Sequence, residues 1–139
     1  MDSAPFEAVL RLATTHARIV RELETRIGGH HGLGFSELRL LRALAAAPDH
    51  RLRPTDLAAE LEMTASGVTR AILPLEKRGI VKRESDPQDA RASRVTLTAA
   101  GRSLAEHASV TAAETTAKLM RRLSVGQIKQ LERLLTEIG

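Results

Sequence analysis

Apolar residues recur along the first part of the chain at the three- and four-residue spacing of an amphipathic helix. The stripe covers Phe6–Ile27, and the glycine-rich run 28–34 predicts that the helix ends there. Ser36 has a short polar side chain suited to an N-cap, so a second helix is expected from that residue to Pro48. Its buried stripe should consist of Leu38, Leu41 and Leu44.

Two short helices are expected next, separated by a brief turn. Pro54 suits the first turn of a helix, where its missing N–H costs nothing, and the segment 51–53 before it is expected to be extended. Thr64 is a suitable N-cap for the following helix, which should close on Gly79. Pro74 lies inside that helix and removes one backbone hydrogen bond, at a cost of about 3 kcal/mol in a regular helix.

The pattern then changes from helical to alternating. Residues 80–84 and 94–98 are expected to form two strands. The segment 85–93 between them is polar, begins with turn residues and is too long for a tight hairpin, so it predicts a protruding loop. Thr98 opens a long helix, and Ser124 is the expected N-cap of the last one.

These elements predict a mainly α fold with a small β-hairpin wing, in a single domain that spans residues 1–139. Residues 36–98 would form a winged helix-turn-helix lobe, and residues 1–34 and 99–139 a helical region. The first and last helices carry more apolar surface than this lobe can cover. A second copy of the chain is the simplest partner that could bury this surface, so we predict a homodimer. Its dimerisation region would be the helical region, residues 1–34 and 99–139. The apolar stripe of the last helix consists of Leu131, Leu134, Leu135 and Ile138.

Composition narrows the class of protein. Apolar residues make up 42% of the chain and aromatic residues only 1%, so the core must consist of Leu, Ile, Val and Ala. Cysteine is absent, which excludes disulfides, thiolate zinc sites and redox sensing by a thiol. Neither a signal-peptide pattern nor an apolar run long enough to span a bilayer occurs, so we expect a cytoplasmic protein without a membrane partner. The formal net charge of +4 favours an anionic partner.

The start of the helix after Thr64 has the side chains that a DNA-reading helix needs. A major groove admits one α-helix, whose N-terminal residues approach the base edges and must be small or able to form hydrogen bonds. Ser66, Thr69 and Arg70 meet this requirement, and no acidic residue occurs in the first two turns. We therefore expect this helix to bind the major groove of double-stranded DNA.

A second DNA contact is expected from the predicted wing. Arg91 lies in the polar segment, and Arg94 begins the strand after it. An arginine on an arm beside a docked helix can enter the minor groove, where the negative potential is enhanced. The candidate DNA-binding residues are therefore Thr64, Ser66, Thr69, Arg70, Arg91 and Arg94.

Several short motifs, taken together and in this order, are similar to those of one protein family. They are Asp56-Leu57-Ala58, Val68-Thr69-Arg70, Leu75–Val81, Asp86–Arg91, Val95–Thr98 and Gly101. Each motif is weak alone. The combination and the order of the helices resemble the MarR family of bacterial transcriptional regulators over nearly the whole chain.

The resemblance implies an obligate homodimer that regulates transcription by binding a palindromic operator, and we expect a repressor. It also implies that Arg91 is the wing arginine and that Asp89 is the wing aspartate that often holds an arginine in this family. Ala90 departs from the pattern, because a second wing arginine is common there, and Arg94 would have to compensate. The resemblance assigns major-groove reading to Ser66, Thr69 and Arg70.

Two further groups of residues have competing interpretations. His16 is the polar exception on the apolar face of the first helix, and it is either packed in the dimer interface or part of a ligand pocket. The second interpretation follows from the resemblance, because many relatives bind small aromatic acids between the dimer base and the DNA-reading lobe. Arg11 and Arg39 would then supply the cation for an organic-acid effector. The pair His30-His31 lacks an accompanying cysteine or spaced carboxylate, so solvated side chains are favoured over a metal site, and no cofactor is expected.

Other classes of function find less support in the sequence. An enzyme is not expected, because no Gly-x-Ser-x-Gly elbow, phosphate-cradling loop or HExxH motif occurs. The remaining alternative is a winged-helix protein-interaction module without DNA binding. Such a module should carry apolar or acidic residues on the exposed face of the fourth helix, and the polar Ser66, Thr69 and Arg70 favour DNA instead.

Overall fold

The structure is a computed structural model of residues 1–139, and it describes every residue except the side chain of Ala90. Helices dominate, and the strands form one small sheet, so the predicted fold class is confirmed. The elements are α1 (Ala4–His31), α2 (Phe35–Ala46), a 3₁₀ turn (Pro48–His50), β1 (Arg51–Leu52), α3 (Pro54–Glu60), α4 (Ala65–Lys77), β2 (Val81–Asp86), β3 (Asp89–Leu97), α5 (Ala99–Leu119) and α6 (Val125–Ile138).

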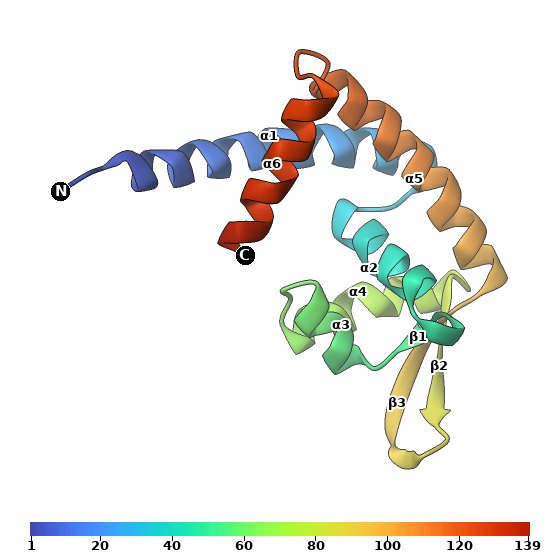
Figure 1. The fold of residues 1–139 in the computed structure, drawn as a ribbon. Coiled ribbons are helices and arrows are strands. Elements are labelled where there is room, and N and C mark those ends of the chain that lie inside the picture. The colour runs from blue at the N-terminus through green and yellow to red at the C-terminus, as the bar shows by residue number, and fades with distance from the viewer.

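Two long helices and a small lobe give the molecule its shape (Figure 1). α5 lies alongside the C-terminal half of α1, and α2 packs against both of them. α3, α4 and the hairpin of β2 and β3 lie on the other side of α2, and the hairpin projects away from the body as a wing. The order of the strands in the antiparallel sheet is β1-β3-β2, so the short extended segment predicted before Pro54 pairs with the wing.

The core lies around α2. The predicted stripe of Leu38, Leu41 and Leu44 is buried, together with Leu40. Leucines, isoleucines and valines from α1, α3, α4 and the sheet complete this core. Aromatic side chains add little, as the composition predicts, because Phe6 is exposed and Phe35 only borders the core.

The first helix is longer than the glycine run predicts. α1 continues through Gly28 and Gly29 to His31, although a glycine inside a helix costs about 1 kcal/mol relative to alanine. The last turn is held by tertiary contacts: Ile27 is fully buried, and the ring Nε2 of His31 lies 2.7 Å from the Thr111 hydroxyl of α5. The helix ends at Gly32, whose φ of +64° is the left-handed conformation that favours glycine. The helix therefore ends inside the glycine-rich run, as predicted, but at His31 and not at Ile27.

The prediction of Ser36 as the second N-cap is also wrong. α2 begins at Phe35, and Ser36 is exposed within its first turn. Two glutamates satisfy the free backbone donors of this turn: the Gly34 N–H donates to Glu37 Oε1 at 3.1 Å, and the Phe35 N–H donates to Glu24 Oε1 at 2.8 Å. Since Glu24 comes from α1, a tertiary contact shifts the start of the helix. The N-caps Thr64, Thr98 and Ser124 are confirmed, because each side chain accepts a backbone N–H three residues on.

The wing is a tight hairpin instead of a hairpin with a long loop. β2 and β3 extend through most of the segment 85–93, with Asp86 paired to Asp89 across a two-residue turn. Asp86 Oδ1 accepts the Gln88 N–H at 2.9 Å, which closes this turn locally. A register shift between Ser85 and Asp86 accommodates the extra residues that made the segment seem too long.

Apolar side chains of α6 and of the N-terminal half of α1 lie uncovered. No residue of α6, all of which the structure describes, is buried, and Leu134 is 49% exposed and Ile138 77% exposed. On α1, burial begins only at Leu23, and Phe6 is 63% exposed. Figure 1 shows this half of α1 extending beyond the rest of the protomer. The predicted surplus of apolar surface is therefore present. None of the described helices is long and apolar enough to cross a bilayer.

Candidate nucleic-acid interface

The N-terminus of α4 presents a polar face to solvent. Thr64 caps the helix, and its Oγ1 accepts the Gly67 N–H at 3.0 Å. The opposite face carries Val68 and Ile72, which are buried and orient the helix on the core. A helix so anchored exposes the predicted reading residues, which lie at positions 66, 69 and 70 and therefore share one side of the helix.

The three predicted reading residues differ in how far their side chains are already engaged in hydrogen bonds within the protein. The Thr69 hydroxyl donates to the Ala65 carbonyl at 3.1 Å, and Ser66 Oγ lies 3.3 Å from Thr64 Oγ1. Arg70 is exposed and makes one long contact, from Nε to the Ser66 carbonyl at 3.5 Å. No described carboxylate lies within ion-pair distance of Arg70. Its guanidinium is therefore available for a bidentate contact with a guanine or a phosphate.

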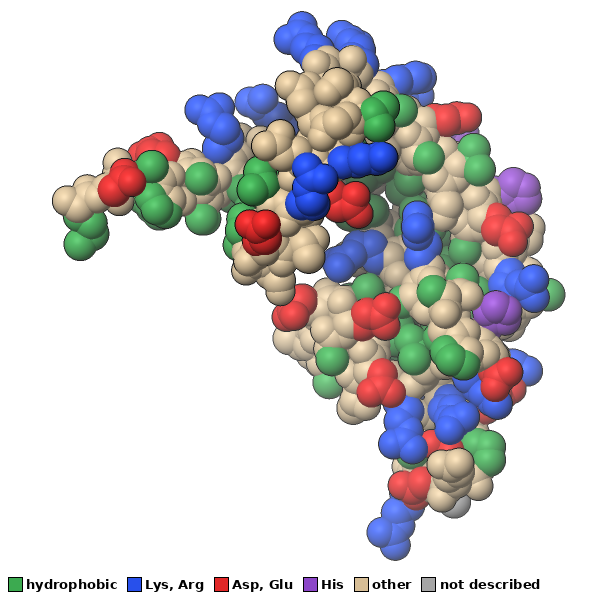
Figure 2. Space-filling model, viewed as in Figure 1, with side chains coloured by type: hydrophobic (Ala, Val, Ile, Leu, Met, Phe, Trp, Pro, Cys, Tyr) green, Lys and Arg blue, Asp and Glu red, His purple; other side chains and the backbone are tan. Residues whose placement is uncertain are grey.

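Arg91 lies in β3 near the tip of the wing. Its side chain is exposed, and its backbone N–H donates to Asp89 Oδ1 at 3.0 Å. Among the described residues, no acidic side chain forms an ion pair with Arg91, so its charge is free like that of Arg70. Figure 2 shows basic side chains over the wing, interspersed with acidic ones. Ala90, which stands where a second wing arginine is common in the family, has a side chain outside the described residues, so the structure does not test that prediction.

Arg94 is oriented differently from Arg91. Its side chain is 24% exposed, and its Nη2 lies 3.2 Å from Asp86 Oδ1. Asp86 also accepts two hydrogen bonds from Arg53, from Nη2 at 2.6 Å and from Nε at 3.1 Å. Since Arg53 directly precedes α3 and Arg94 lies in β3, the carboxylate joins the wing to the helix-turn-helix. The aspartate that holds arginines in this wing is thus Asp86, whereas the resemblance pointed to Asp89.

Sequence reasoning did not find Arg53. It lies 33 residues from Asp86, and no local pattern marks such a pair. The one signal in the sequence is that Arg53 comes immediately before the helix-opening Pro54, which fixes the direction of the chain there. The role of Arg94 in DNA binding stays a prediction, but its pairing with Asp86 indicates a positioning residue.

The environment of Asp86 holds the pKa of its carboxyl below the ordinary value. The hydrogen bond from the Gln88 N–H has the largest effect, and the hydrogen bond from Arg53 and the charge of Arg94 act in the same direction. The side chain itself has no exposed surface. A charged carboxylate in this place is therefore stabilised by its donors.

Replacing Asp86 with asparagine should destabilise the protein at neutral pH, because the amide keeps the shape but loses the charge that both arginines bind. A lowered pKa contributes stability above the pKa of the unfolded carboxyl, about 4, and this stability is lost as the pH falls through the folded value. The difference in free energy of unfolding between wild type and Asp86→Asn should therefore be constant above about pH 5 and shrink in acid. Denaturant unfolding at several pH values measures it. A difference that grows as the pH falls would contradict this account of the wing. Asp89→Asn is the matched control.

A second arginine contact joins α4 to the first helix. Arg78 at the C-terminus of α4 donates from Nη1 to the Gly32 carbonyl at 2.9 Å and from Nη2 to the His31 carbonyl at 3.3 Å. Carbonyls at the end of a helix lack partners within it, so a guanidinium is a suitable cap for α1. Sequence reasoning missed this contact too, because the partners are backbone atoms more than 40 residues away.

The residues of the predicted ligand pocket are not brought together within one protomer. Arg11 lines a shallow hollow on α1 with residues of that helix alone. His16 is exposed on α1, and Arg39 is exposed on α2. Their assignment to a pocket depends on a partner protomer and stays a prediction. Around His30 and His31, the described residues form no group of three side chains that could hold a metal ion.

Comparison with known proteins matches these observations to one family. The MarR family model matches residues 31–92. The HTH-type transcriptional repressor Rv2887 of Mycobacterium tuberculosis is 31% identical over 108 residues, which are 78% of this chain and 76% of that protein. The HTH-type transcriptional regulator PrsX of Escherichia coli is 36% identical over 73 residues, which are 52% of this chain but only 44% of PrsX. The chain thus matches less than half of the length of PrsX.

The fold itself is similar to that of a solved regulator over the whole chain. Sco3205 from Streptomyces coelicolor, described as a MarR family transcriptional regulator in complex with DNA, aligns with a TM-score of 0.89. The alignment covers 99% of this chain and 87% of Sco3205 at 24% identity. At that identity the likeness concerns the fold alone, and it includes both the winged lobe and the long helices.

Proposed function

The chain belongs to the MarR family, and on that premise we propose that it is a transcriptional repressor that binds a palindromic DNA operator as a homodimer. The observation that carries the proposal is the pair of free arginines on one lobe, Arg70 on α4 and Arg91 on the wing. Arg53 and Arg94 of the same lobe instead share the single carboxylate of Asp86. Arg70 and Arg91 are thus available to an external anion at the positions where a winged helix contacts DNA. Acting on the chromosome, the protein would be located in the bacterial cytoplasm.

Selection of genomic fragments by the purified protein tests the proposal. We expect enrichment of a short palindrome, because a two-fold symmetric dimer presents two copies of α4 to half-sites about one helical turn apart. Random fragments should bind more weakly and with a strong salt dependence. If no sequence is enriched and the protein elutes early from heparin, the alternative of a protein-interaction module without DNA binding is favoured. No catalytic role is part of the proposal, and the named relatives are regulators.

The homodimer is proposed from the uncovered apolar faces of α1 and α6. Replacing Leu134 with aspartate should unfold the protein instead of giving a stable monomer, because a charge would be buried in the interface. Sedimentation and circular dichroism at micromolar concentration measure assembly and folding together. Arg133→Asp, on the polar side of the same helix, is the control and should leave the dimer intact. A stable folded monomer of the wild type would contradict the dimer.

We also propose that a small aromatic or other organic acid releases the operator. This effector would bind where the dimer brings Arg11 and His16 of α1 near Arg39 of the DNA-binding lobe. The absence of cysteine leaves no thiol for an oxidant to act on, so peroxide followed by a thiol reductant should not switch binding reversibly.

A further inference from the structure

Leu73 is an exposed apolar residue on the outward face of α4. Its side chain is 45% exposed, and it is the only exposed large hydrophobic residue among the described residues of the winged helix-turn-helix lobe. The others lie in the helical region, which the proposed dimer uses. Leu73 follows Ser66 by seven residues and Thr69 by four, so helical spacing places all three on one side of α4. A helix that enters the major groove with this side would bring Leu73 to the base edges as well.

Thr69 also presents an apolar group on this side. Its hydroxyl donates its only hydrogen to the Ala65 carbonyl at 3.1 Å, one turn back along the helix. Because the β-carbon is branched, a hydroxyl held in this direction leaves the methyl group in another staggered position. Thr69 is exposed, so the methyl is the group that it can offer to a base without breaking a hydrogen bond. Since residues four apart are neighbours on a helix, this methyl and Leu73 are adjacent.

The chemistry of these two side chains selects one kind of base edge. Thymine alone presents a methyl group in the major groove, whereas the other bases present hydrogen-bond donors and acceptors there. An apolar side chain against such a polar edge would remove its water without replacing the hydrogen bonds, which is costly. Arg70 comes directly after Thr69 and three residues before Leu73, and its guanidinium is suited to the O6 and N7 atoms of a guanine.

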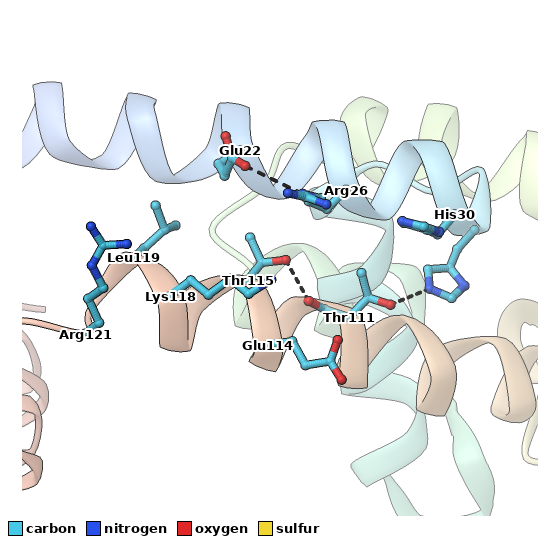
Figure 3. A pocket seen from close by; sticks show the side chains of 10 residues that line it. Glu22, Arg26, His30, Thr111, Glu114, Thr115, Lys118, Leu119 and Arg121 are labelled. Carbon is cyan, nitrogen blue, oxygen red and sulfur yellow. Dashed lines mark hydrogen bonds and ion pairs between the residues drawn. The ribbon is translucent and has the colours of Figure 1, made fainter.

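The position of α4 is held by contacts at its far end. A methyl contact needs this, because a gap of about 0.5–1 Å already loses a quarter to a half of the dispersion energy. Arg78 at the end of α4 donates to the carbonyls of Gly32 and His31 at the end of α1. The His31 ring in turn contacts Thr111 of α5, and Figure 3 shows this contact as the dashed line from Thr111 to the histidine ring. The reading helix is thereby fixed to both long helices.

We propose that the Thr69 methyl and Leu73 form an apolar strip that reads the methyl groups of thymines beside the guanine bound by Arg70. The inference rests on the proposed function and specifies what each operator half-site contains: a guanine with thymine next to it. Thr69 determines specificity through its methyl group and not through its hydroxyl. Leu73 joins the reading residues, although neither charge nor hydrogen bonding marks it in the sequence.

Exchange of thymine for deoxyuridine in the operator tests the proposal, because it removes one methyl group and keeps the base pair with adenine. The operator is the palindrome enriched from genomic fragments, and each thymine is exchanged in both half-sites at once. Fluorescence anisotropy measures the affinity. We expect a loss of about tenfold at a contacted thymine, since each methyl contact contributes about fourfold and two copies are lost. Thymines outside the half-sites are the control and should show no effect.

Two variants of Thr69 separate its methyl group from its hydroxyl. Thr69→Ser keeps the hydroxyl and should bind the thymine and deoxyuridine operators equally at one position of the half-site. Thr69→Val keeps the methyl and should retain the preference for thymine. Leu73→Ala should lose the preference at a neighbouring thymine. Thr25→Ser is the matched control, because the exposed Thr25 of α1 donates to the Arg21 carbonyl in the same way, and it should retain the preference at both positions.

The possible failures are distinguishable. If wild type binds the thymine and deoxyuridine operators equally, or if the enriched palindrome has no thymine beside a guanine, the proposal is overturned while the proposed function stands. A preference that Thr69→Ser keeps and Thr69→Val loses assigns the reading to the hydroxyl and also overturns it. If no palindrome is enriched at all, the proposed function itself is rejected.

Discussion

Replacing Arg70 with alanine should weaken operator binding by about 2–6 kcal/mol and relax discrimination at one base pair of each half-site. A base-reading arginine contributes about 1–3 kcal/mol, and a symmetric dimer loses two copies at once. The structure favours this role because the guanidinium projects from the first two turns of α4 without an acidic partner among the described residues. Binding to random DNA should change much less, so the ratio of operator to random affinity is the decisive quantity.

Arg91→Ala is the informative comparison for Arg70→Ala. Arg91 lies near the wing tip, where contacts with phosphates and the minor groove position the protein without reading a unique base pattern. Its loss should weaken all sequences alike and reduce the log–log salt slope by about two per dimer, if each copy neutralises one phosphate. Arg122→Ala, in the turn between α5 and α6, removes the same charge and should leave both quantities unchanged.

Fluorescence anisotropy across a salt series, with operator and random duplexes, separates these outcomes. If Arg70→Ala leaves the ratio of operator to random affinity unchanged, α4 does not read bases through this residue. If neither Arg70→Ala nor Arg91→Ala weakens binding, the DNA-binding surface lies elsewhere on the chain.

The elements could be predicted from the sequence wherever local signals determine them. The stripe of leucines in α2, the caps Thr64, Thr98 and Ser124 and the alternation in the strands depend on neighbours within four residues. The exposed face of α4 was predictable for the same reason, because helical spacing places its polar residues opposite its buried ones.

The errors occur where a distant residue decides the local outcome. α1 passes two glycines because Ile27 is buried and His31 contacts α5, and α2 starts early because Glu24 accepts the Phe35 N–H. The pairing of Arg94 with Asp86 was not predicted either, whereas its contact with DNA stays a prediction. Its pairing with Asp86 depends on the hairpin turn and, through Arg53, on the approach of α3. Spacing along the chain contains no information on these contacts.

Gly101 is a position where a single methyl group should have a large effect on stability. It lies in the first turn of α5, directly beneath the residue that links α4 to β2. A Cβ at this position would be 2.1 Å from the Ile80 carbonyl oxygen and 2.6 Å from Leu97 Cδ1. The Ile80 carbonyl cannot easily move away, because it also accepts the Thr98 N–H at 3.1 Å. Close approach of backbones, and not an unusual φ, is therefore what requires glycine here.

Gly101→Ala should lower the free energy of unfolding by about 3 kcal/mol, at the upper end of the usual cost of overpacking, because backbone must move on both sides. Since α5 and the wing meet at this point, operator affinity should also fall. Gly29→Ala is the matched control: it lies inside α1 with no atom within 4 Å of the added Cβ, and it should stabilise the protein by about 0.5–1 kcal/mol. Urea unfolding of all three proteins at one protomer concentration measures the differences, because the stability of a dimer depends on concentration. Coincident unfolding curves for wild type and Gly101→Ala would show that α5 can withdraw from Ile80 at no cost, and the packing of the wing against α5 described above would then be wrong.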